Sequence, residues 1–207
     1  MDFVETWVSA ARAFADLVEH VPADRWGGPG LGEWTLRELV GHTCSAGLRT
    51  VVTTLAHSVD TEEISSPQDY YALATTVDPA VYSAAVAAST DDAKRTGVEL
   101  GDDPATPVRL LVADAVATVM GAVPDMLVAS AGGGMRVSAW LPTRTFELAV
   151  HSLDVARALG RPAGLSAQVI GDTAALAARI AAATGHGPDV VLALTGRGHL
   201  TDGFSVV

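Results

Sequence analysis

Apolar residues recur at helical spacing in one long segment of this sequence after another. In residues 2–20 the apolar side chains stand three or four positions apart, at Phe3, Trp7, Ala10, Ala11, Phe14, Leu17 and Val18. This period places them on one face of an amphipathic helix that ends near His20. Several such faces in one chain can be buried against each other, so we expect a mainly α fold packed as an antiparallel helical bundle.

Capping residues divide the chain into further helices. Starts are marked by an N-cap side chain or by a proline in the first turn, and they occur at Thr35, Ser66-Pro67, Asp78-Pro79, Pro107 and Pro142. Thr35 and Glu38 have the spacing of a capping box, and the apolar face behind them continues to about His57. Gly160 is placed to end the helix that begins at Pro142, since glycine readily takes the left-handed conformation of a helix end.

The remaining segments predict a little β structure. Residues 135–140 alternate weakly and are read as a short extended piece, and the run "DVVLALTG" at 189–196 is typical of a strand. The run "SAQVIGDTAALAARIAAATG" before it predicts a helix. We therefore expect a helical bundle over residues 1–160 and a short helix-strand, or α/β, appendage over residues 161–207.

Composition and charge exclude several classes of protein. The 13 Lys and Arg residues against 24 Asp and Glu residues give a formal net charge of −11, without the basic cluster that nucleic acid requires. The most apolar region is interrupted by Asp114, Pro124 and Asp125, so no membrane span is expected. The N-terminus lacks the pattern of a signal peptide, and the single Cys44 cannot form an internal disulfide. We expect a cytoplasmic monomer or homodimer.

One helix carries side chains of the types that bind metal ions. Glu147 and His151 lie four positions apart, so their side chains share a face, with Arg144 and Asp154 on the same stripe. Catalytic zinc sites use three protein ligands and one open position, and His42 in another strong helix is a candidate for the third ligand. Alternatively, Glu147 and His151 form a weak surface pair, and His42 is a hydrogen-bonded core residue. Cys44 points away from His42 and is read as a small buried hydrophobe.

Three stretches resemble a known family: "LGEWTLRELVGHTCSAG", "LPTRTFELAVHSLDVARALG" and "VVLALTGRGHLTDGFSVV". They are similar to the mycothiol-dependent maleylpyruvate isomerase family, which belongs to the DinB-like superfamily of four-helix bundles. The resemblance implies a divalent metal, most commonly Zn²⁺, held at His42, Glu147 and His151. It covers nearly the whole chain in order.

The resemblance also implies a thiol chemistry. Mycothiol, the low-molecular-weight thiol of actinobacteria, would be held as a thiolate at the open metal position. In the isomerase reaction the thiolate adds to the cis double bond of maleylpyruvate, the adduct rotates, and elimination gives fumarylpyruvate. The same thiolate could attack another small electrophile, as in an S-transferase. Because residues 161–207 are shorter than the α/β domain of the characterised isomerase, the electrophile stays open.

Two further residues have alternative interpretations. Arg144 is a candidate anchor for a carboxylate of the substrate or of the thiol, or else forms an ion pair with Asp154 or a loop acid. Asp154 either orients a metal ligand or pairs with Arg157 on the helix surface. The alternatives to an enzyme are a bundle that binds a metal or small ligand without turnover, and a metal-free interaction module.

Overall fold

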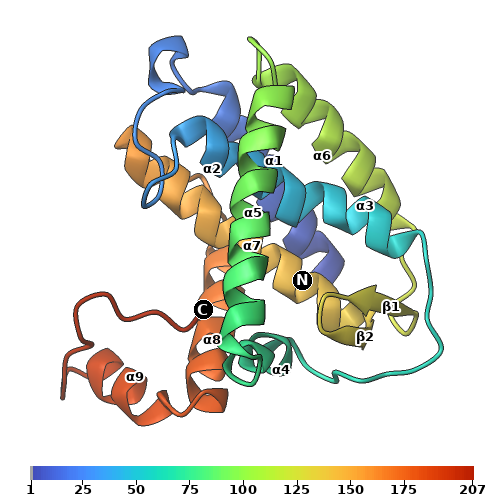
Figure 1. Cartoon of the computed structure of the whole chain (residues 1–207), viewed down its shortest axis with the longest axis vertical. Helices are drawn as coiled ribbons and strands as arrows, with labels where there is room; N and C mark the ends of the chain where they lie inside the picture. The colour runs from blue at the N-terminus through green and yellow to red at the C-terminus, as the bar shows by residue number, and fades with distance from the viewer. Residues whose placement is uncertain (1) are drawn as a thin grey trace.

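Four helical segments of the computed structural model, which describes residues 2–207, pack in a closed ring (Figure 1). In chain order, the first segment contacts the third and the fourth, and the second segment also contacts the third and the fourth. The segments are α1 (Phe3–Glu19), α2 with α3 (Leu36–Thr43 and Thr50–Leu55), α6 (Ala105–Met120) and α7 (Val137–Leu159). The predicted mainly helical bundle is confirmed.

The core of this bundle is built from the apolar faces that the periodicity predicts. Its largest fully buried side chains include Trp7, Phe14, Leu39, Leu48 and Trp140. Burying each such side chain contributes roughly 1.5–3 kcal/mol relative to leaving it in water. Within the described residues, no helix has both the length and the apolar character that crossing a membrane requires.

Two helices and a hairpin cover the outside of the bundle. Helix α4 (Pro67–Ala72) begins at the predicted Ser66 N-cap, and the long α5 (Pro79–Glu99) begins at Asp78 and packs against α2. Strands β1 (Leu127–Ser130) and β2 (Gly133–Arg136) form an antiparallel pair, with Leu127 opposite Arg136. Only the first residues of the extended piece predicted at 135–140 are therefore in a strand.

The helix predicted to begin at Pro142 starts five residues earlier, at Val137. Buried Val137, Trp140 and Leu141 continue its apolar face upstream, so the proline lies inside the helix and not at its start. Gly160 ends the helix with φ 66°, as predicted, because this left-handed conformation is strained for other residues.

The strand predicted at residues 189–196 is wrong. After α8 (Ala167–Ala183), which packs on α7, α4 and α1, the chain forms a short helix, α9 (Gly187–Leu194). Pro188 and Asp189 lie in the first turn, where both favour a helix. A strand here would need a neighbouring strand to form hydrogen bonds with its backbone N–H and C=O groups, whereas a helix forms these hydrogen bonds within itself. The small sheet of the fold lies at residues 127–136 instead.

The long helix predicted after the Thr35 capping box is interrupted by one turn of different geometry. The capping box is present, with Thr35 accepting from the Glu38 backbone N–H. Between α2 and α3, residues Cys44–Arg49 form a π-helical turn (η2). A π turn inserts an extra residue into a helix, and the insertion rotates the side chains of α3 about the helix axis relative to those of α2.

Helices α2 and α5 approach each other through two glycines. A Cβ atom at Gly41 would lie 2.5 Å from the carbonyl oxygen of Ala93 and 2.5 Å from the backbone nitrogen of Gly97. Because both atoms belong to the α5 backbone, they cannot move aside as a flexible side chain would. Glycine at position 41 therefore sets the distance between the two helices.

We expect Gly41→Ala to destabilise the protein by about 1–3 kcal/mol, because the added methyl group forces α5 away from α2. Urea unfolding followed by circular dichroism measures this difference. Gly171→Ala in α8 is the matched control, since no atom lies within 4 Å of a Cβ there. That control should be stabilised by about 0.5–1 kcal/mol through helix propensity. Equal stability of the two variants would contradict the close-packing argument.

Candidate functional site

The packing of α2 against α7 brings together the three residues singled out from the sequence. One ligand atom from each of His42, Glu147 and His151 can be chosen so that all three lie within 4.8 Å of one another. The two imidazole rings meet edge to face with centroids 4.8 Å apart. Nε2 of His151 is 3.5 Å from Oε2 of Glu147, one helical turn away. Two nitrogens and a carboxylate at this spacing form a donor set suited to Zn²⁺.

His42 is held from both sides. The ring of Trp34, which precedes the capping box, lies with its centroid 4.8 Å from that of the imidazole. Ser89 of α5 places its hydroxyl 3.4 Å from Nδ1. Burial, together with the charge of nearby His151, lowers the pKa of His42 to about 4. The ring is therefore neutral at physiological pH, the form that donates a lone pair to a metal.

Glu147 is an ionised carboxylate in a largely buried position. Burial alone would raise its pKa, but the hydrogen bond with His151 and the positive charge of Arg144 outweigh burial and lower it. Tyr71 of α4 adds a third interaction, because its hydroxyl donates to Oε1 of Glu147 at 3.0 Å. The same hydroxyl lies 3.1 Å from the carbonyl oxygen of Thr143. Glu147 is thus negatively charged and fixed in direction.

Asp154 faces the second nitrogen of His151. Its Oδ2 lies 3.2 Å from Nδ1, while the other nitrogen, Nε2, is directed to Glu147. Burial lowers the pKa of His151, but the hydrogen bonds to Asp154 and Glu147 outweigh this effect and raise it. Within residues 2–207 Asp154 forms no ion pair with Arg157 or Arg144. The geometry therefore places Asp154 behind a histidine and not in a surface pair.

Arg144 is a buried cation, with 6% of its surface exposed. Its guanidinium donates to the carbonyl oxygen of Ala46 in the π turn at 3.2 Å and to the hydroxyl of Tyr70 at 3.3 Å. It also lies over the rings of Tyr70 and Trp140, 5.4 and 5.9 Å from their centroids. No carboxylate of the described residues is within 4.0 Å of it. The charge is stabilised by dipoles and aromatic faces, without an ion-pair partner in this part of the chain.

A cavity of about 240 Å³ connects the cation with one of the three clustered side chains. Arg144 and His42 line it together with Ser45, Ser89 and Asp92. Its walls come from α2 with η2 and α3, from α4, α5 and α7, and from the turn after β1. A small molecule in this cavity would meet a positive charge on one side and the imidazole of His42 on another.

Several residues of this site lie outside the pattern read from the sequence. Tyr70 and Tyr71 come from a helix far away in the chain, and Trp34 comes from the loop before α2. Two adjacent tyrosines after the Ser66-Pro67 helix start are the only local signal, and they do not indicate which helix the hydroxyls reach. Contacts between distant segments have no periodicity in the sequence.

Cys44 takes no part in the site. It is fully buried on the core side of the chain, and burial raises the pKa of its thiol to about 12. A thiol of this kind is protonated and unreactive at neutral pH. His20 and His57 are exposed, and His20 lies 2.6 Å from the carbonyl oxygen of Asp16 in its own helix.

Comparison with known proteins connects this site with a family. No curated protein and no solved structure matches the chain significantly. A family model described as the mycothiol maleylpyruvate isomerase N-terminal domain matches residues 7–156. The match includes most of α1, both helices that carry the clustered side chains, and the π turn between α2 and α3. Since it spans well over half of the sequence, the chain belongs to the family of the mycothiol maleylpyruvate isomerase N-terminal domain.

Proposed function

We propose that this protein is an enzyme that binds a divalent metal, Zn²⁺ by preference, at His42, Glu147 and His151 and uses mycothiol to transform an electrophilic small molecule. The observation that carries the proposal is the convergence of these side chains from α2 and α7 to within 4.8 Å. Family membership supports the link to mycothiol. The reaction would be a cis-trans isomerisation of the maleylpyruvate type or an S-transfer.

The donor set fits the metal that the family implies. His42 presents a neutral ring and Glu147 a carboxylate. His151, whose raised pKa keeps it protonated without a metal, would release the proton of Nε2 and bind through that nitrogen, which is directed to Glu147. Three protein ligands leave one coordination position for a further ligand, as in catalytic zinc sites. When bound, the ion would lower the pKa of a thiol so that the thiol reacts as a thiolate at neutral pH.

Arg144 would bind and orient the electrophile. A buried guanidinium without an ion-pair partner is costly, and a carboxylate of the substrate would offset this cost through two parallel hydrogen bonds. Since Arg144 and His42 line one cavity, a carboxylate on the arginine would hold the rest of the molecule near the thiol. This favours electrophiles that carry a carboxylate.

Tyr71 and Asp154 would act through the ligands that they contact. Tyr71 directs Oε1 of Glu147, and this leaves Oε2 facing His151. Asp154 accepts from Nδ1 of His151 in the tautomer that leaves Nε2 free to bind a metal. Such partners hold ligand side chains in place before the metal arrives.

The metal site is tested by measuring zinc content and zinc affinity against a competing chromophoric chelator. We expect about one ion per chain, and a loss of affinity in Glu147→Ala and His151→Ala greater than the roughly 10–100-fold that removal of an outer partner costs. His57→Ala, at an exposed histidine, is the matched control and should bind normally. Full occupancy in the two ligand variants would refute the site assignment.

Tyr71→Phe should weaken zinc binding by roughly tenfold, because Glu147 loses the donor that orients its carboxylate. Tyr82→Phe removes the hydroxyl of an exposed tyrosine on α5 and serves as the control. The unfolding midpoint of each metal-free variant separates a positioning effect from a loss of stability. An unchanged zinc affinity in Tyr71→Phe would show that the hydroxyl supports α4 packing only.

The reaction is tested by incubating the zinc-loaded protein with mycothiol and maleylpyruvate, or with other carboxylate-bearing electrophiles, and following product by chromatography. Arg144→Met should lower kcat/KM for a carboxylate substrate by roughly 10–100-fold, because charge-assisted hydrogen bonds are lost. The corresponding neutral ester should react equally with both proteins, and the exposed Arg157→Met serves as control. Saturable binding of substrate without any product would favour a non-catalytic binding protein over an enzyme.

A further inference from the structure

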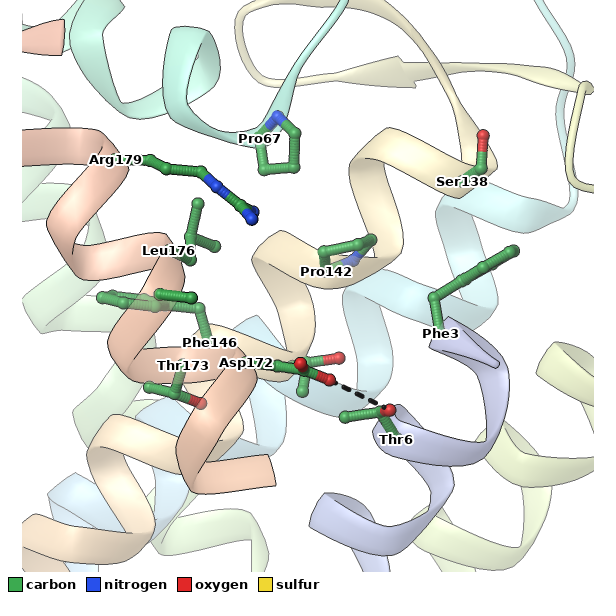
Figure 2. A pocket seen from close by; sticks show the side chains of 12 residues that line it. Phe3, Thr6, Pro67, Ser138, Pro142, Phe146, Asp172, Thr173, Leu176 and Arg179 are labelled. Carbon is green, nitrogen blue, oxygen red and sulfur yellow. Dashed lines mark hydrogen bonds between the residues drawn. The ribbon is translucent and has the colours of Figure 1, made fainter. Parts of the chain in front are cut away.

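A second cavity lies on the opposite flank of α7 from the clustered histidines. It has a volume of about 290 Å³, and Figure 2 shows the side chains that α1, α4, α7 and α8 direct toward it. On α7 it is lined by Ser138, Pro142, Thr145 and Phe146. At 100° per residue this stripe lies roughly opposite the one with Arg144, Glu147 and His151. The two cavities are therefore separated by the body of the helix.

One end of this second cavity carries a positive charge. Arg179 of α8 extends over it, with the guanidinium toward Pro142 and beside Leu176 (Figure 2). Within residues 2–207 this guanidinium has no carboxylate within 4.0 Å. Arg179 is exposed to solvent, so its guanidinium can bind an anion at the cavity without breaking an ion pair within the described part of the chain.

The other end offers hydrogen-bond acceptors. Asp172 stands two turns before Arg179 on α8, roughly 10 Å along the helix, and accepts hydrogen bonds from Thr6 (Figure 2) and from the side-chain amide of Gln168. Each carboxylate oxygen can accept more than one hydrogen bond. Pro142 has no N–H, so the carbonyl oxygen of Ser138 lacks its partner in the helical ladder. Both residues line the cavity. A ligand group at this end would have to donate.

The middle of the cavity is apolar, and one polar group there is unsatisfied. Phe146, Leu176 and Pro142 form the walls. Thr173 also lines the cavity and is 9% exposed, and its hydroxyl has no hydrogen-bond partner within the described residues. Because its oxygen is itself buried, Thr173 offers mainly apolar surface to the cavity.

We propose that this cavity is a second small-molecule site, and that it binds an aromatic carboxylate with a hydrogen-bond donor at its far end. Arg179 pairs with the carboxylate, the ring packs against Pro142 and the wall formed by Phe146 and Leu176, and the donor reaches Asp172 or the Ser138 carbonyl. 4-Hydroxyphenylacetate carries a carboxylate and a hydroxyl donor at opposite ends of one ring, and it serves as the probe of this chemistry. The proposal does not depend on the metal site or on the thiol reaction.

The test is a titration of the ¹⁵N-labelled protein with 4-hydroxyphenylacetate, followed by amide chemical shifts. We expect saturable shifts at Thr145, Phe146, Thr173 and Leu176, with His42 and His151 unaffected. The neutral 4-hydroxyphenylacetamide should bind at least about threefold more weakly, because it cannot form the ion pair. Absence of saturable shifts at these residues, or shifts confined to the His42 side, would overturn the proposal.

Two variants test separately the contribution of the Arg179 charge and the contribution of the cavity space to binding. Arg179→Met should reduce binding of the acid to the level of the amide and leave the amide unchanged, whereas Arg157→Met on exposed α7 surface should change neither. Ala175→Phe, which places a ring at the exposed edge of the cavity, should weaken both ligands. Equal affinity of acid and amide for the original protein, or full binding by Ala175→Phe, would refute the site. An unchanged unfolding midpoint shows that each variant is folded.

Discussion

The packing of α2 against α7 is the contact on which the rest of the structure depends. It buries the apolar faces of both helices, and in the same step it places His42 beside Glu147 and His151. The approach of α5 to α2 through Gly41 supports this arrangement from outside, because α5 brings Ser89 to the imidazole of His42. One hydrophobic interface thus contributes to stability and sets the geometry of the proposed metal site.

Electrostatics inside the bundle follow from that contact. Charged groups are rare in protein interiors because removing them from water is costly, and here a cation, an anion and two imidazoles lie within one region. Arg144 lowers the pKa of Glu147, and Asp154 together with Glu147 raises that of His151, so neighbours offset part of the cost of burial. Arg144 itself has only neutral hydrogen-bond partners and aromatic rings. Arg144 is therefore available to form an ion pair with an anionic ligand, which agrees with the proposed reaction.

Helix α7 serves two sides of the molecule. The stripe that carries Glu147 and His151 and the stripe around Pro142 face different neighbours, α2 on one flank and α8 on the other. Pro142 has no N–H, so the carbonyl oxygen of Ser138, a residue that lines the second cavity, has no partner in the helical ladder. A helix that is buried nearly all round can in this way border two separate ligand sites.

The sequence by itself determined the helices, their capped ends and the spacing of Glu147 and His151, because these depend on neighbours within a few residues. The Thr35 capping box and the Gly160 helix end are examples. Local patterns failed where contacts with distant segments determine the secondary structure. Residues 189–196 have strand-like side chains but form a helix, because no neighbouring strand in residues 2–207 pairs with them. The helix predicted at Pro142 extends upstream because the core buries Trp140. The same holds for the site. The contact of Asp154 with His151 lies within one helix at i,i+3 spacing and follows from the stripe that they share in the sequence. Only the tertiary structure decided that Tyr71 reaches Glu147 and that Arg144 is buried without a carboxylate, since these features depend on segments far apart in the chain whose separation carries no periodic signal.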